Sequence, residues 1–231
     1  MDQWWNRVTA TAAMPDRTAI IVIALAALAC VVWRPAWRVG RHVVTVAHEG
    51  AHGVVALAAG RRLSGIRLHS DSSGLTVSRG KPRGFGMVAT LFAGYCGPGL
   101  LGLGAAALLR SGHAVGMLWL LLIALVLLLL QIRNLYGLWV VLASGAVLFG
   151  VTWWLPGTSQ SVVALAVAWF LLFAAPWSVI DMQRTRHAGR GAGSDPDQLA
   201  RITPFPALLW VLAMLLITLA CLGGGAWLLL R

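Results

Sequence analysis

The sequence predicts an all-α polytopic membrane protein with about six to seven transmembrane helices and a short β-hairpin on the cytoplasmic side. The chain of 231 residues is 59% hydrophobic and only 11% charged, whereas soluble domains carry about 25% charged residues. Seven apolar runs of roughly 15 to 25 residues fill most of the chain, as a bilayer core of about 30 Å requires. Little sequence remains for a soluble domain, so we expect one integral membrane domain over residues 1–231.

The apolar runs give approximate boundaries for the spans. We expect spans near residues 18–33, 42–60, 85–109, 114–132, 135–155, 160–180 and 206–230. Only residues 132–137 separate the fourth run from the fifth, so a count of six remains open. A polar head that carries both acidic and basic residues precedes the first run, which favours an uncleaved first span over a signal peptide.

The charged residues are mostly basic and lie between the apolar runs. Lys and Arg number 18 against 7 acidic residues, for a net charge of +11. Arg-rich cytoplasmic loops and anionic lipid headgroups account for this excess, and we expect no nucleic-acid partner. The positive-inside rule places the N-terminus and the loops 61–84 and 181–205 in the cytoplasm. The three Arg residues of the first connection oppose this orientation.

Two polar segments differ from the spans. Residues 66–69 and 75–78 alternate between apolar and polar on either side of a Ser/Asp/Gly turn, which is typical of a β-hairpin; a plain polar loop is the alternative. Residues 181–205 predict a flexible polar connector. Within it, Ser194-Asp195-Pro196 is typical of a helix start.

The chemistry is concentrated in the sequence His48-Glu49-Gly50-Ala51-His52, which falls inside the second apolar run. On a helix the two His side chains lie one turn apart on one face, where both can bind a single metal ion. Glu49 then lies beside the ion as a general base for a bound water. Two His and one Glu are expensive to bury in a bilayer without a functional reason.

Two histidines leave a catalytic zinc site short of a ligand, because such sites usually take three protein ligands and a water. The chain has only seven acidic residues from which a third ligand could come. Asp195, at the predicted helix start, is the first candidate, and Asp181, at the end of the sixth span, is the second. A loop aspartate reaches the expected depth of the histidines only if its segment dips between the spans.

Several segments resemble the site-2 protease superfamily of intramembrane zinc metalloproteases, and in particular its small bacterial, peptidase M50B-like branch. The resemblance runs from Val43 to about Trp210. It rests on the membrane-embedded HExxH sequence, Gly74-Leu75-Thr76 in the hairpin, the Gly-rich stretch 93–99, the sequence Arg133-Asn134-Leu135-Tyr136-Gly137, and Ser194-Asp195 with Leu199-Ala200, Thr203, Pro206 and Trp210.

This resemblance implies one Zn²⁺ per chain, with His48 and His52 as ligands and Glu49 as the base. Ser194-Asp195 is similar to the Ser-Asp-Ala sequence of the smaller branch, although Pro196 replaces the Ala. The Asn-Pro-Asp-Gly-like motif of well-described site-2 proteases is missing.

The resemblance also suggests how a membrane-protein substrate with a transmembrane segment is held in the lipid bilayer. The strand edge with Leu75, Thr76 and Val77 would keep the substrate extended by β-augmentation. Asn134 would bind the substrate backbone, or simply cap a turn.

Three functions remain to be compared. The first is hydrolysis of a peptide bond in or near a substrate's transmembrane segment. The second is a catalytically silent membrane scaffold or chaperone with the same fold, and the third is a metal-handling or transport protein. The intact His48, Glu49 and His52 favour hydrolysis over the other two.

Overall fold

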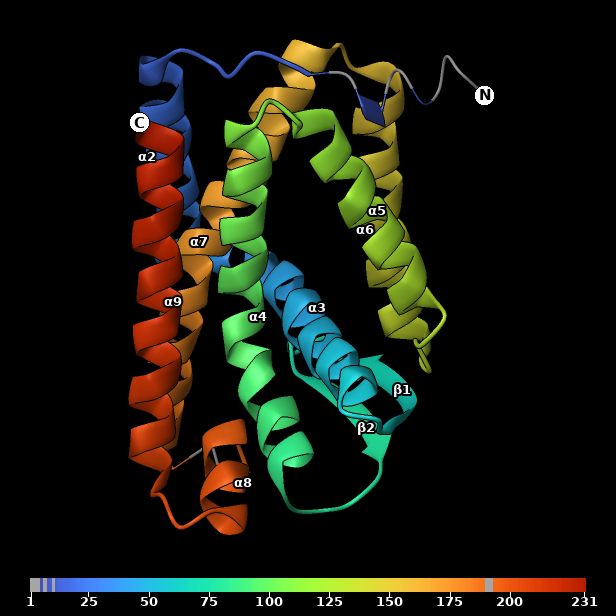
Figure 1. Cartoon of the computed structure of the whole chain (residues 1–231), viewed down its shortest axis with the longest axis vertical. Coiled ribbons are helices and arrows are strands. Elements are labelled where there is room, and N and C mark those ends of the chain that lie inside the picture. Colours follow the sequence, from blue (N-terminus) through green and yellow to red (C-terminus); the bar gives the residue numbers. More distant parts are fainter. Residues whose placement is uncertain (1–4, 6–7, 10, 190–192) are drawn as a thin grey trace.

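The computed structural model describes residues 5, 8–9, 11–189 and 193–231, and in these ranges the chain is mostly helical with one two-stranded sheet (Figure 1). In chain order the elements are α2 (Arg17–Val32), α3 (Arg34–Ala58), β1 (Arg62–Leu68), β2 (Gly74–Arg79), α4 (Phe85–Arg110), α5 (Ala114–Leu129), α6 (Leu135–Trp154), α7 (Gly157–His187), α8 (Asp195–Ile202) and α9 (Ala207–Leu230).

Four of the described helices are long and apolar enough to cross a membrane, namely α4, α6, α7 and α9. The bent pair α2–α3 makes a fifth candidate if it is one span, and α5 is a shorter apolar helix of 16 residues. These helices define an integral membrane protein. The expected count of six to seven spans is not confirmed by helix length and composition alone.

The first two predicted spans form a broken unit. The axes of α2 and α3 differ in direction by 96°, and the break lies at Trp33, whose backbone is extended. Pro35 lies in the first turn of α3. Because proline has no backbone N–H, it cannot continue the hydrogen-bond ladder of α2. The chain therefore changes direction between α2 and α3.

Because of this bend, α2 and the hairpin that follows α3 lie toward opposite ends of the molecule. Figure 1 shows the start of α2 and the C-terminus at one end of the molecule and the hairpin and α8 at the other. The N–H of Ala12 donates to the carbonyl of Gly112 in the α4–α5 turn (2.9 Å), which ties the N-terminal segment to the first end. The start of α2 thus lies at the end opposite to the two polar segments, which the sequence analysis expected on the same, cytoplasmic side as the N-terminus.

Helix α4 lies at the centre of the fold and packs against α3, α7 and α9. Its contact with α3 is lined by small side chains, which include Ala47, Ala51 and Gly97. Small residues let two helix backbones approach closely. The close approach brings the HExxH turn of α3 against the lower half of α4.

The β-hairpin is confirmed. β1 and β2 pair antiparallel, with Ile66 opposite Thr76 and Leu68 opposite Gly74. The outer edge of β1 is covered by the α5–α6 turn, where the N–H of Ile66 donates to the carbonyl of Gln131 (2.7 Å) and the carbonyl of Ile66 accepts from the N–H of Arg133 (2.9 Å). In the described part of the chain the outer edge of β2 has no strand partner.

In its described parts, residues 181–189 and 193–205, the segment that the sequence predicted as a flexible connector is largely helical. Helix α7 continues to His187, and Arg184, Arg186 and His187 in its last turn complement the helix dipole. Helix α8 then begins at Asp195, as the predicted start signal indicated. Residues 190–192, in the middle of the expected connector, lie outside the described residues.

Candidate metal centre

Helix α3 presents the two histidines of the HExxH sequence side by side. Their Nε2 atoms are 3.0 Å apart and their ring centroids 4.6 Å apart. His52 and Glu49 are buried, and His48 is partly buried. The ligand atoms of His48, Glu49 and His52 all lie within 4.8 Å of one another, so this group could hold a metal ion.

Asp195 meets the two histidines from α8. Its Oδ2 atom lies 3.2 Å from His48 Nε2 and 3.3 Å from His52 Nε2. The same oxygen is buried and has no hydrogen-bond partner among the described residues. A buried carboxylate oxygen that faces two ring nitrogens is satisfied by a cation placed between them.

The spacing of the three atoms suits zinc. Tetrahedral zinc with bonds of about 2.0 to 2.1 Å keeps its ligand atoms roughly 3.3 Å apart. The three separations here are 3.0, 3.2 and 3.3 Å. The residues present therefore fit a zinc ion with His48, His52 and Asp195 around it.

The α3–α4 contact orients one of the rings. His52 Nδ1 donates to the backbone carbonyl of Thr90 in α4 (2.6 Å). This hydrogen bond leaves the lone pair of Nε2 directed at the cluster, as in zinc sites whose histidines are held by a carbonyl. His48 is packed edge-on against the ring of Tyr95, with centroids 4.6 Å apart. The sequence analysis did not identify Thr90 or Tyr95; their only signal was their place in or beside the Gly-rich stretch.

Two glycines make room for the cluster. A Cβ at Gly94 in α4 would collide with the rings of both His48 and His52, and a Cβ at Gly74 in β2 would collide with the Glu49 carboxylate. Both positions therefore require glycine for steric reasons. Gly74 belongs to the sequence Gly74-Leu75-Thr76 that the resemblance singled out, and its contact explains that pattern.

Helix α8 is held in place by an ion pair. Asp197 Oδ1 accepts from Arg186 Nη2 (2.5 Å) and Nε (3.2 Å), and its Oδ2 accepts from the hydroxyl of Ser194 (2.8 Å). The hydrogen bond from Arg186 lowers the pKa of Asp197 below its ordinary value of 3.8. This pair links α7 to the first turn of α8, and so fixes the helix that carries Asp195.

A cavity of about 520 Å³ opens onto the cluster. Its walls come from α3, the hairpin, α4, α7 and the start of α8, and Asp195 lines it together with His48, Glu49 and His52. Asp181, the second candidate ligand, also lines this cavity. Among the contacts of the described residues, Asp181 has no ion pair with either histidine.

The residues expected to bind substrate are divided between two places. Leu75 and Thr76 line the cavity, whereas Val77 and Asn134 do not. Thr76 donates its hydroxyl to Glu49 Oε2 (2.6 Å). The side-chain amide of Asn134 bonds to the hairpin: its oxygen accepts from the N–H of Leu68 (3.2 Å), and its NH₂ group donates to the carbonyl of Leu68 (2.6 Å).

The helices and this site define a class of protein: an integral membrane protein with a candidate HExxH metal centre. A comparison with protein families agrees, because the peptidase M50B-like family model matches residues 20–225. The chain belongs to the peptidase M50B-like family. No curated protein and no solved structure matches it significantly. Peptidases of the M50 group are zinc-dependent metallopeptidases.

Proposed function

We propose that this chain is an intramembrane zinc endopeptidase, which hydrolyses peptide bonds in or near transmembrane segments of membrane proteins. The observation that carries the proposal is the convergence of His48 Nε2, His52 Nε2 and Asp195 Oδ2 within 3.3 Å of one another. Glu49 lies beside them, as the HExxH mechanism requires.

The proposed ligands are His48, His52 and Asp195, with one zinc ion per chain. When bound, zinc supplies Lewis-acid activation of a water molecule and of the peptide carbonyl. Glu49 takes the proton of the water on its carboxylate and passes it to the leaving amine. The hydroxyl of Thr76 keeps this carboxylate in place beside the cavity. Burial of Glu49 and His52 limits the access of bulk water to the reacting groups.

The substrate is held extended along the outer edge of β2. A peptide bond inside a helix has its N–H and C=O groups engaged, so the substrate must unwind before cleavage. The free edge offers backbone partners to an unwound segment by β-augmentation. Leu75 and Thr76 line the cavity at this edge, and Val77 lies between Thr76 and Ser78, which also lines it. Asn134 supports the arrangement by holding the other strand, β1.

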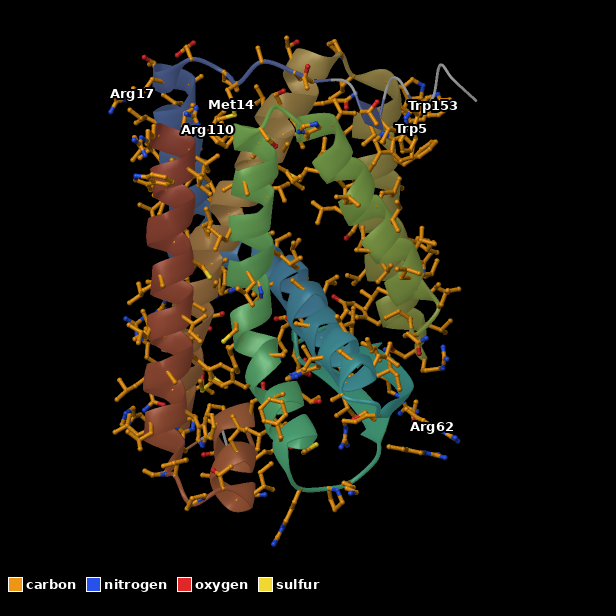
Figure 2. The ribbon with its side chains drawn as sticks, viewed as in Figure 1. Trp5, Met14, Arg17, Arg62, Arg110 and Trp153 are labelled. Carbon is orange, nitrogen blue, oxygen red and sulfur yellow. The ribbon has the colours of Figure 1, made fainter. Side chains whose placement is uncertain are left out.

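The proposed topology is one integral membrane domain with six crossings, by the bent pair α2–α3, α4, α5, α6, α7 and α9. Arg17 and Arg110 lie at the end that holds the start of α2 and the C-terminus, whereas Arg62 projects from the hairpin at the other end (Figure 2). Basic residues are frequent at the hairpin end, in and beside the hairpin, at the end of α7 and in α8. They are Arg61, Arg62, Arg67, Arg79, Lys81, Arg83, Arg184, Arg186 and Arg201. By the positive-inside rule the hairpin end faces the cytoplasm, and the start of α2 and the C-terminus then face the opposite side.

The catalytically silent scaffold is not favoured. A scaffold has no need for three ligand atoms and a buried base in one cavity, since each of these groups costs free energy to bury.

Metal content and cleavage together test the proposal. Detergent-purified wild type should bind close to one zinc, and His52→Ala and Asp195→Ala should lose it. Asp181→Ala, which removes an acid from the same cavity, should keep its zinc. Glu49→Gln should keep zinc and lose cleavage of a reconstituted membrane-protein substrate. Folded wild type that takes up no zinc would overturn the proposal, and retention of zinc by Asp195→Ala would overturn the ligand assignment.

A further inference from the structure

One end of the catalytic cavity is basic. Arg41 lines the cavity from α3, and it follows the same helical face as Thr45, His48 and His52. Spacings of four, three and four residues keep these side chains on one stripe of a helix. Arg41 therefore lies in line with the two histidines, seven residues and about 10 Å before His48 along α3.

The guanidinium of Arg41 is available to a ligand. Among the described residues it has no hydrogen-bond acceptor and no ion-pair partner. Two other arginines that are at least partly buried are engaged: Arg61 donates to Ser78 and Lys81, and Arg186 donates to Asp197. A partly buried cation without a partner, in the wall of a cavity, is suited to bind an anion.

A second cavity of about 280 Å³ continues this basic end. It shares Trp37, Asp181 and Thr185 with the catalytic cavity and adds Arg34 and Arg184. The guanidinium of Arg184 lies over the ring of Trp177, 5.3 Å from its centroid. Across the two cavities this end is lined by three arginines and one acid, Asp181, so its net charge favours an anionic group.

The hairpin leads a peptide toward this end. The hydroxyl of Thr45 donates to the carbonyl of Ser72 (2.8 Å), just before β2 begins at Gly74. Farther along β2, Thr76 contacts Glu49 and Ser78 contacts Arg61. A segment added to the free edge of β2 therefore runs past Glu49 and ends beside Arg41.

We propose that the site selects peptide segments that carry an acidic residue about three to four positions from the cleaved bond, bound by Arg41 with Arg34 and Arg184 behind it. The position follows from geometry, because about 10 Å corresponds to three residues of extended chain at about 3.3 Å each. The inference rests on the proposed peptidase function, and it adds a substrate class to it. A peptide carboxylate is favoured over a lipid phosphate because Arg41 faces the cavity that contains Glu49.

Binding and cleavage are measured separately to test this. Binding uses the Glu49→Gln variant in phosphatidylcholine nanodiscs, with fluorescent model peptides that consist of a Leu/Ala transmembrane helix and an extended Gly/Ser segment. One Asp is placed at each position of that segment in turn, and the matched peptides carry Asn or Lys there. Cleavage of the same peptides by wild type is mapped by mass spectrometry. Arg41→Gln and Arg41→Glu are added to each background, and Arg83→Gln, an exposed arginine outside both cavities, is the control.

The expected result is a preference of about tenfold for Asp over Asn at positions on one side of the segment only, as one charge-assisted hydrogen bond supplies. Arg41→Gln should abolish this preference without weakening binding of the Asn peptides, and Arg41→Glu should favour the Lys peptides. Arg83→Gln should behave as its background does.

Equal binding of Asp and Asn peptides by the Glu49→Gln protein would overturn the inference. So would a preference that survives Arg41→Gln, or one that appears only when phosphatidylglycerol is added, because the arginines would then serve lipid. Absence of cleavage by wild type, with the Asp preference intact, would overturn the peptidase function and leave the acidic-peptide site standing.

Discussion

The hydroxyl of Thr76 donates to the carboxylate of Glu49, 2.6 Å away. A longer contact of 3.1 Å joins the same hydroxyl to the backbone carbonyl of Glu49. Because a hydroxyl has one proton, the shorter contact takes it. The strand that we propose to bind substrate is thus attached directly to the proposed base, so a substrate that pairs with β2 also fixes the position of the base.

Removing this hydroxyl should slow catalysis without affecting the metal. Thr76→Val loses a hydrogen bond to a charged acceptor, worth about 1.5 to 3 kcal/mol, which corresponds to at least a tenfold drop in kcat. Thr76→Ser should retain most of the activity. Cleavage rate and zinc content are measured together, and a Thr76→Val protein with unchanged kcat would show that Glu49 is positioned without the hairpin.

Gly94 should be intolerant of even the smallest side chain. In Gly94→Ala the new methyl group meets the rings of His48 and His52, so we expect zinc affinity to fall by a factor of ten or more. Gly104→Ala in the same helix is the matched control, because a Cβ there meets nothing within 4 Å. That variant should keep its zinc and gain up to about 1 kcal/mol of helix stability. Competition with a fluorescent chelator compares the two, and equal affinities would contradict the close packing of α4 on the cluster.

Arg186 and Asp197 should act as positioning residues through α8. Asp197→Asn weakens the ion pair that ties α8 to α7, and so loosens the helix that holds Asp195. We expect zinc to be lost to a chelator several-fold faster, with little change in the unfolding temperature of the spans. Arg186→Gln should behave in the same way. Arg201→Gln, an exposed arginine on α8, serves as the control, and faster loss from that variant too would point to a general effect of charge.

Asn134 should matter for stability. Asn134→Ala leaves the backbone N–H and carbonyl of Leu68 without partners, at a cost of about 1 to 3 kcal/mol. The thermal unfolding midpoint should fall, whereas Leu135→Ala, which trims a side chain that is 78% exposed, should leave it nearly unchanged. Unchanged stability with a raised KM would instead favour the role in substrate binding that the resemblance suggested.

Local sequence patterns were sufficient to predict part of the fold and part of the candidate site. The one-turn spacing of His48 and His52 needs only a helix, and the hairpin needs only period-two alternation around a turn. The sequence Ser194-Asp195-Pro196 identified the start of α8. Family membership, inferred from such short sequences, is confirmed by the match over residues 20–225.

Local sequence patterns could not predict the features that depend on tertiary contacts. The approach of Asp195 to the histidines depends on the tilt of α3 and on the docking of α8, and neither follows from periodicity. The contacts of Thr90 and Tyr95 arise between two helices that have no polar pattern in common. The bend at Trp33 did have a local signal in Pro35, but a long apolar run on each side of it also suits two separate spans.

One of the proposed crossings is shorter than the membrane. Helix α5 has 16 residues, which is about 24 Å of helix against about 30 Å of hydrocarbon. The bilayer beside α5 has to become thinner, or headgroups have to move toward the midplane, because tilting a short helix reduces its reach further. Leu128 of α5 lies near Gly50, next to the proposed base Glu49. Hydrophobic mismatch would therefore bring water close to the reacting bond, and bilayer thickness becomes a physical control on the rate of hydrolysis.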